Sequence, residues 1–306
     1  MKRNEILYWV LRLGGKIAPR VPVSLAYRLA DLVGAAAFAL AGEQRTALLG
    51  NLGVALGETR TEAEIAGIAR RAFENNARNW VDTMRINSLS RDQLGEMIHV
   101  EGWEHLTAAL EAGRGVVMVS LHLGNFDLVG QILTIHDIHL TVPIERMKPE
   151  RLFDLLVEDR ATRGVTMIAV DEAPRSLLKA LRKGEVVGVM ADGNVAGERV
   201  HVDLFGLPVA LPRAPAQLAR ATGAAVVVAV GTRLSNGRFV GHISPAVPIV
   251  HGQDIEQDHA ENTQRIAIEL ERFIRCFPEQ WMAFTPFWGQ VEQPADRINH
   301  RTEARI

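Results

Sequence analysis

Short apolar runs alternate with helical segments from residue 115 onward, and this alternation constrains the possible folds more than any other feature of the chain. Strand and helix in alternation imply right-handed crossovers and a largely parallel sheet covered on both faces. The sequence therefore predicts an α/β fold with a largely parallel central sheet flanked by helices. The expected strands are residues 116–121, 140–144, 165–170, 186–191, 224–230 and 239–243. The expected helices are residues 127–136, 149–163, 173–183, 213–222 and 254–276.

The first hundred residues carry helical patterns instead. Thr61 and Glu64 form a helix start signal, and apolar residues at helical spacing follow it toward a stop near Asn87. We see no internal repeat or low-complexity tract along the chain. We therefore expect two parts, N-terminal membrane-interface helices in residues 1–44 and a single α/β domain in residues 45–306.

Residues 1–28 combine basic charge with apolar character. They hold six basic residues and one acidic residue, a net charge of +5 in a chain whose overall formal charge is −2. Basic charge beside Trp, Tyr and Leu is typical of a helix that lies in a membrane interface, and a core helix with a basic side is the alternative. The uncharged run at 32–42 has 11 residues, whereas a bilayer span needs about 20. The start of the chain lacks the pattern of a secretory signal.

Composition argues against several classes of function. Lys plus Arg number 34 against 36 for Asp plus Glu, a balance that argues against nucleic acid as the main partner. The single cysteine, Cys276, excludes an internal disulfide framework and any multi-cysteine metal centre. His136 and His139 flank Asp137 without a third ligand at a suitable spacing, so we expect no metal site. The sequence also lacks a Walker loop for nucleotide binding.

Ionisable groups follow three of the predicted strands, at the edge where ligands gather in parallel sheets. The first strand delivers His122 and Asp127, the second Glu145 and Arg146, and the fourth Asp192. Three such strand ends are more than a purely structural sheet needs. We therefore expect the chemistry of the protein at this edge.

His122 and Asp127 are candidates for a base and its carboxylate. Residues five apart lie about 140° apart around a helix, so the two can meet only across a loop, for which Gly124 supplies the backbone freedom. A carboxylate fixes the tautomer of a histidine and stabilises its charged form, as general-base activation of a hydroxyl or thiol requires. Alternatively, Asn125 or Asp127 caps the next helix and His122 is a buried structural histidine.

A nucleophile does not accompany this pair in the sequence. Cys276 lies in a late helix, Ser120 lies inside the strand, and no G-x-S-x-G elbow occurs. A histidine base without a protein nucleophile fits direct transfer, in which the hydroxyl of an acceptor attacks an activated carbonyl. Backbone N–H groups at Gly124 and at the following helix start are candidate donors for the negative charge on the carbonyl oxygen.

Residues 119–127, Val-Ser-Leu-His-Leu-Gly-Asn-Phe-Asp, resemble the H-x4-D/E signature of the bacterial glycolipid acyltransferases. These include the lipid A late acyltransferases and the phosphatidylinositol mannoside acyltransferases. Other stretches between residues 45 and 288 are similar to family blocks and come in the same order. They are residues 73–75, 204–208 with 211–212, 221–224 and 278–281. Residues 79–82 and 145–149 look more like the mannoside-acylating branch.

The resemblance implies roles for particular residues. His122 would be the general base and Asp127 its partner, while charged groups on the acceptor side would fall on Glu145, Arg160 and the segment 192–201. Arg146 and Arg160 are alternative donors to the carbonyl oxygen, or they hold phosphate groups of the donor or acceptor. The expected substrate-binding residues are Asn125, Glu145, Arg146, Arg160, Asp192 and Arg199.

The resemblance also implies the reaction, which is transfer of a fatty acyl group from a coenzyme A or acyl-carrier-protein thioester to a sugar hydroxyl of a membrane glycolipid. No cofactor beyond the thioester donor is expected. The enzyme would lie on the cytoplasmic face of the plasma membrane as a peripheral or monotopic protein. Its apolar N-terminal segments would form the membrane seat or a slot for the acyl chain. Two alternatives stay open: acyl transfer to glycerol phosphate or a lysophospholipid, and a non-catalytic lipid-binding protein on the same scaffold.

Overall fold

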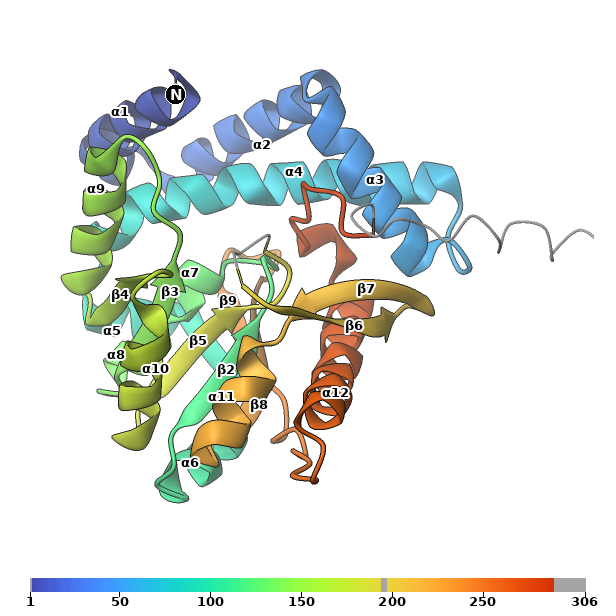
Figure 1. Cartoon of the computed structure of the whole chain (residues 1–306). Coiled ribbons are helices and arrows are strands. Elements are labelled where there is room, and N and C mark those ends of the chain that lie inside the picture. Colours follow the sequence, from blue (N-terminus) through green and yellow to red (C-terminus); the bar gives the residue numbers. More distant parts are fainter. Residues whose placement is uncertain (1, 194–196, 289–306) are drawn as a thin grey trace, which may run out of the picture.

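A seven-stranded sheet forms the centre of the computed structural model, which describes residues 2–193 and 197–288 (Figure 1). The strand order is β1-β9-β8-β2-β5-β3-β4, and every neighbouring pair is parallel except β8 with β9. These observations confirm the predicted fold class. The strands are β1 (Ile98–Glu101), β2 (Val116–Ser120), β3 (Leu140–Ile144), β4 (Val165–Ala169), β5 (Val186–Met190), β8 (Ala225–Arg233) and β9 (Phe239–Ile243).

Helices cover both faces of this sheet, and burial on both faces explains why the valine-rich strands read as continuous apolar runs. One face packs against α5 (Arg91–Met97), α6 (Trp103–Glu111), α7 (Phe126–Val129) and α8 (Gln131–Ile135). The other face packs against α10 (Ala173–Arg182), α11 (Ala214–Thr222) and α12 (Ile255–Cys276). The segment predicted as one helix at 127–136 is the pair α7 and α8, which meet at Gly130.

Two strand regions differ from the sequence-based expectation. β1 is a four-residue edge strand inside the first hundred residues, where the sequence predicts helices only. β6 (Arg199–Leu204) and β7 (Leu207–Pro212) form a separate antiparallel hairpin that packs against α12. The hairpin is buried on one face only, so β6 alternates polar and apolar residues, and the run of β7 is interrupted by Pro208.

The N-terminal helices lie across the carboxyl ends of the central strands, with α4 nearest the sheet (Figure 1). They are α1 (Lys2–Ile17), α2 (Val23–Leu40), α3 (Gly42–Leu56) and α4 (Glu62–Arg85), and α9 (Glu150–Ala161) packs between α1 and β4. The predicted start signal is confirmed, because Thr61 and Glu64 form a reciprocal capping box. The expected boundary after residue 44 lies inside α3, and the division into two parts stays a prediction.

Small residues bring α2 close to α4. Ala26, Ala30 and Gly34 are the buried residues of α2, and a Cβ atom on Gly34 would lie 2.5 Å from the Cα atom of Glu74. The large apolar residues of α2 therefore point away from the protein. The exposed ones on α1 and α2 are Ile6, Trp9, Val10, Leu13, Ile17, Val23, Leu25, Leu29, Leu32, Val33 and Leu40.

Within the described residues, α2 is the one helix that is long and apolar enough to cross a membrane by length and composition. Its 18 residues have a mean hydropathy of 1.5, and only 17% of them are buried. The apolar helix is longer than the uncharged run at 32–42, since it begins at Val23. Two charged residues, Arg28 and Asp31, lie within it.

We expect Gly34→Ala to lower the free energy of unfolding by about 1–3 kcal/mol, because the added methyl group would press on the backbone of α4. Urea unfolding measures the change. Gly50→Ala is the matched control, since Gly50 lies in α3 with no atom within 4 Å of the added Cβ atom. This control should raise the free energy of unfolding by up to about 1 kcal/mol. Equal effects of the two substitutions would contradict the close packing of α2 on α4.

Candidate active site

The register of two parallel strands places His122 beside Asp192. Ser120 of β2 pairs with Met190 of β5, and each of the two side chains lies two residues beyond its strand. The Nδ1 atom of His122 lies 2.8 Å from the Oδ1 atom of Asp192. A histidine and a carboxylate 70 residues apart in the sequence therefore meet at the carboxyl edge of the sheet.

The carboxylate of Asp192 is buried, and both of its oxygens accept hydrogen bonds. Its side chain is 1% exposed, whereas that of His122 is 41% exposed. The backbone N–H group of His122 donates to both carboxylate oxygens, at 3.0 and 2.9 Å, and the indole Nε1 of Trp281 donates to Oδ2 at 3.1 Å. Such an arrangement holds the ring with Nδ1–H toward Asp192 and leaves Nε2 as the atom that can accept a proton.

The environment raises the pKa of His122. Burial lowers this pKa, but the negative charge of Asp192 and the hydrogen bond to it act in the opposite direction and outweigh burial. A base must be unprotonated to act, so catalysis by His122 would grow as pH rises through the raised pKa. The ion pair itself adds stability below the ordinary pKa of histidine and is lost as pH rises through the folded-state value.

Asp127 binds an arginine and not the histidine. It lies in the first turn of α7, where its Oδ2 atom accepts a hydrogen bond of 3.0 Å from Nη2 of Arg160 on α9. The expected pairing of His122 with Asp127 is therefore wrong in this structure, because Asp192 occupies that position. The reason is local: the helix has already begun at Phe126, so Asp127 belongs to α7, where Arg160 of α9 binds it. A catalytic role for Asp127 stays a prediction.

Asn125 is a structural residue, as the capping alternative proposes. Its Oδ1 atom accepts from the N–H group of Leu128, and its Nδ2 atom donates to Asp82. The side chain is buried, and both of its polar atoms are engaged within the protein. In this structure Asn125 caps α7 and Asp192 holds His122, and the expected substrate-binding roles of the two residues stay predictions.

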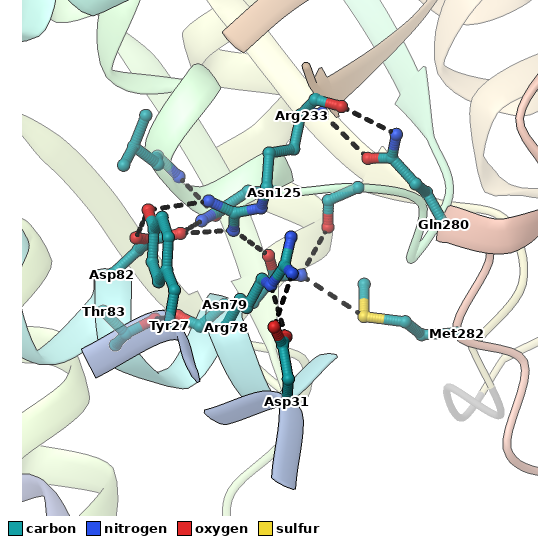
Figure 2. A network of polar contacts seen from close by, with 12 residues as sticks. Tyr27, Asp31, Arg78, Asn79, Asp82, Thr83, Asn125, Arg233, Gln280 and Met282 are labelled. Atoms are coloured by element: carbon teal, nitrogen blue, oxygen red, sulfur yellow. Dashed lines mark hydrogen bonds and ion pairs between the residues drawn. The ribbon is translucent and has the colours of Figure 1, made fainter. Parts of the chain in front are cut away.

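A buried polar network fixes the loop between β2 and α7 (Figure 2). The guanidinium group of Arg233 on β8 binds Asp82 and Asn79 of α4 and Tyr27 of α2. Asn79 also donates to the carbonyl oxygen of Gly124 at 2.7 Å. Burial and the charge of Asp82 raise the pKa of Tyr27 well above its ordinary value, so this hydroxyl stays a donor to Asp82.

The loop also lies directly on β8. Gly124 has a φ of +61°, and a Cβ atom there would lie 1.8 Å from the carbonyl oxygen of Gly231. Its N–H group donates to Gln280, and that of Asn125 donates to Gly231. These two N–H groups are therefore unavailable to a substrate. The suggestion that Gly124 supplies donors to a carbonyl oxygen is wrong for this conformation.

His122 lies at a cavity of about 1340 Å³. Asp127, Glu145 and Arg160 line the same cavity, together with Gly193, Gly197 and Glu198 from the predicted segment 192–201. Residues 194–196 of that segment lie outside the described residues. One apolar part of the lining lies between the sheet and α7–α8, and its side chains include Met118, Ile132, Leu133, Leu140, Val142 and Met167. Other apolar lining residues, among them Leu177 and Leu218, lie on the opposite sheet face.

Two of the expected binding residues are engaged elsewhere. Arg146 is exposed and pairs with Asp171 at 3.2 Å and with Glu172. Arg199 donates to the backbone carbonyl groups of Ala210 and Gly193. Neither arginine lines the cavity in the described part of the chain. Their substrate-binding roles stay predictions.

We expect Asp192→Asn to lower the pKa of His122, because the amide removes the charge that stabilises the imidazolium while burial of the ring remains. The pKa is measured by NMR titration of the imidazole C–H signals. Asp127→Asn is the matched control, and it should leave the titration of His122 in place because Asp127 binds Arg160. A shift in Asp127→Asn with none in Asp192→Asn would contradict the assignment of the partner.

Comparison with known proteins agrees with the geometry. The profile of the bacterial lipid A biosynthesis acyltransferases matches residues 2–290. The chain is 31% identical to a phosphatidylinositol mannoside acyltransferase of Mycobacterium tuberculosis over 224 residues, which cover 71% of this chain and 69% of the relative. It is 29% identical to the protein of the same name from Mycolicibacterium smegmatis, with 72% of each chain covered. The resemblance expected from the sequence blocks is thus confirmed. The chain belongs to the family of bacterial lipid A biosynthesis acyltransferases, and it is an acyltransferase.

Proposed function

We propose that the protein moves a fatty acyl group from a coenzyme A or acyl-carrier-protein thioester to a sugar hydroxyl of a membrane glycolipid, of the phosphatidylinositol mannoside or lipid A type. The family supports glycolipid acyl transfer in general. One observation carries the finer proposal: a histidine bound to a buried aspartate opens onto a cavity whose inner part is apolar. No cofactor takes part in the proposed reaction.

In the proposed mechanism, His122 acts as the general base. Its Nε2 atom takes the proton of the acceptor hydroxyl as the oxygen attacks the thioester carbonyl, and Asp192 stabilises the imidazolium that forms. The tetrahedral intermediate then expels the thiolate of the donor, which takes up the proton from His122. Direct transfer is supported because, in the described residues, the His122 ring is hydrogen bonded to Asp192 and to no hydroxyl or thiol.

Arg160 is the guanidinium that faces the cavity beside His122, and we assign it to negative charge on the substrates. Its partner Asp127 is itself about as buried, with the two side chains 15% and 14% exposed. Asp127 would then act by holding Arg160 in place. This proposal gives the H-x4-D motif two separate duties, because its histidine holds the proton and its aspartate positions a cation.

The apolar part of the cavity is the proposed slot for the acyl chain. It runs from His122 along one sheet face and beneath α7 and α8, so the slot lies inside the α/β body. With the acyl chain inside the α/β body, the N-terminal helices would serve the other of their two expected roles, which is binding to the membrane. Their outward apolar residues and the basic charge of residues 1–28 support this role. A position on the cytoplasmic face, as a peripheral or monotopic protein, fits attraction to anionic lipids.

Transfer to glycerol phosphate or a lysophospholipid is the less supported alternative. It requires a basic pocket around Arg146 and Arg160 to hold the acceptor phosphate. Arg146 is neutralised by Asp171 and Glu172 and does not line the cavity in the described residues, and Arg160 is paired with Asp127. Arg160 alone is then left for an acceptor phosphate, and one guanidinium paired with a carboxylate is not the basic pocket that this alternative requires.

We expect His122→Ala to lower the rate of acyl transfer by about 10²–10⁴-fold, because it removes the base while Asp192 keeps its other hydrogen bonds. The measurement is mass spectrometry of lipids acylated by the pure protein in a mixed extract that contains both glycolipids and lysophospholipids. Unfolding curves control for the fold. Near-normal turnover of the variant would overturn the mechanism, and acylation of lysophospholipids alone would overturn the proposed acceptor.

We expect the double substitution Leu32→Glu with Val33→Glu to release the protein from anionic vesicles, because these side chains are 68% and 63% exposed and would carry charge into the interface. Sedimentation with vesicles measures the bound fraction. Leu207→Glu is the control, since Leu207 is 44% exposed but lies on the β6–β7 hairpin. Undiminished binding of the double variant would show that this face of α2 is not the membrane seat.

A further inference from the structure

A glycine occupies the middle of β5, one of the central strands. Glycine weakens the interior of a strand, and it often marks a place where a ligand or another backbone comes close. The backbone of Gly188 is not in the left-handed region that requires glycine, since its φ is not positive. Some steric reason must therefore account for the missing side chain.

Two other glycines on the same sheet face have such a reason in the protein itself. A Cβ atom on Gly231 of β8 would lie 2.5 Å from Cβ of Val129, and one on Gly241 of β9 would lie 3.1 Å from Cγ1 of the same valine. Both glycines therefore let α7 rest directly on the sheet. The packing of a helix explains these positions without a ligand.

Gly188 differs in that no helix of the described residues lies over it, and its close neighbours are side chains of the adjacent strand β3. A Cβ atom there would meet only the ends of two side chains of β3, Val142 at 2.9 Å and Leu140 at 3.4 Å, and no helix atom within 4 Å. Leu140, Val142 and Gly188 all line the cavity that begins at His122. The space left by the missing side chain therefore belongs to the cavity.

Gly188 also lies near the inner end of this cavity. It pairs with Met118, four residues before His122, which is about 13 Å along the strand. The next residues of the two strands on the same face, Val116 and Val186, are fully buried and do not line the cavity. Along β2 and β5 the lining therefore ends at Met118 and Gly188, while Leu140 and Val165 extend it by one further residue pair along β3 and β4.

We propose that Gly188 sets the length of the acyl chain that the enzyme accepts, by leaving room for the chain terminus at the inner end of the slot. The inference rests on the proposed function of the cavity as the acyl slot. A side chain at this position would fill the end of the slot and leave the part nearer His122 open. Long acyl chains would no longer fit in the slot, whereas short acyl chains would still fit.

The test compares octanoyl and palmitoyl thioesters as competing donors in one reaction, with wild type, Gly188→Ala and Gly188→Val. We expect the palmitoyl-to-octanoyl ratio to fall in the order of side-chain size, and by at least about tenfold in Gly188→Val. The ratio does not depend on the fraction of folded enzyme. Valine suits a strand, and alanine supplies a milder change if the valine variant folds poorly.

Val187→Ile is the matched control, because it enlarges the neighbouring residue of β5 on the opposite face. It should leave the donor ratio unchanged. An unchanged ratio in both Gly188 variants, with active wild type, would overturn the role of Gly188 alone. Wild type that transfers neither acyl chain would instead overturn the proposed function.

Discussion

The buried ion pair between Arg233 and Asp82 is the contact on which the rest of the site depends. Both side chains are almost fully buried, at 3% and 4% exposure, and they join β8 to α4. Removing one member of such a pair costs about 3–5 kcal/mol, because the other is left as an uncompensated charge. Tyr27 adds α2 to the same cluster, and Asn125 adds the loop that carries His122. Helices α2 and α4 and the edge of the sheet that carries His122 are therefore one structural unit.

Much of the sheet could be predicted from the sequence, because a strand buried on both faces must be apolar along its whole length. Strands β1 and β6 contain charged and polar residues and β7 contains prolines, so the same pattern did not predict them. His122 could also be predicted, since the motif that contains it is short and local. Its partner was assigned wrongly, because the pairing with Asp192 depends on the register of β2 against β5 and not on sequence spacing. The signal existed nonetheless: each residue follows its predicted strand by the same short interval.

The supporting network was beyond prediction for a related reason. Asp82 and Arg233 are separated by 151 residues, and each taken alone is an ordinary charge in a helix or a strand. The orientation of α2 is a different case. Its composition suggests a membrane segment, but only the placement of Ala26, Ala30 and Gly34 against α4 shows that the large apolar residues point outward. The composition of α2 therefore suggested a membrane environment, whereas its packing on α4 determines which side of the helix points away from the protein.

The hydrogen bonds around Asp192 have a consequence for how the protein is made. The carboxylate binds His122 on one side and Trp281 on the other, so the three residues span 160 positions of the chain. Parallel pairing between distant segments forms late in folding, because closing a long loop costs conformational entropy before the stabilising contacts can form. A nascent chain that ends before Trp281 has a histidine without its complete support. The complete hydrogen-bonded arrangement of His122, Asp192 and Trp281 is thus a product of the finished domain, and incomplete chains lack it.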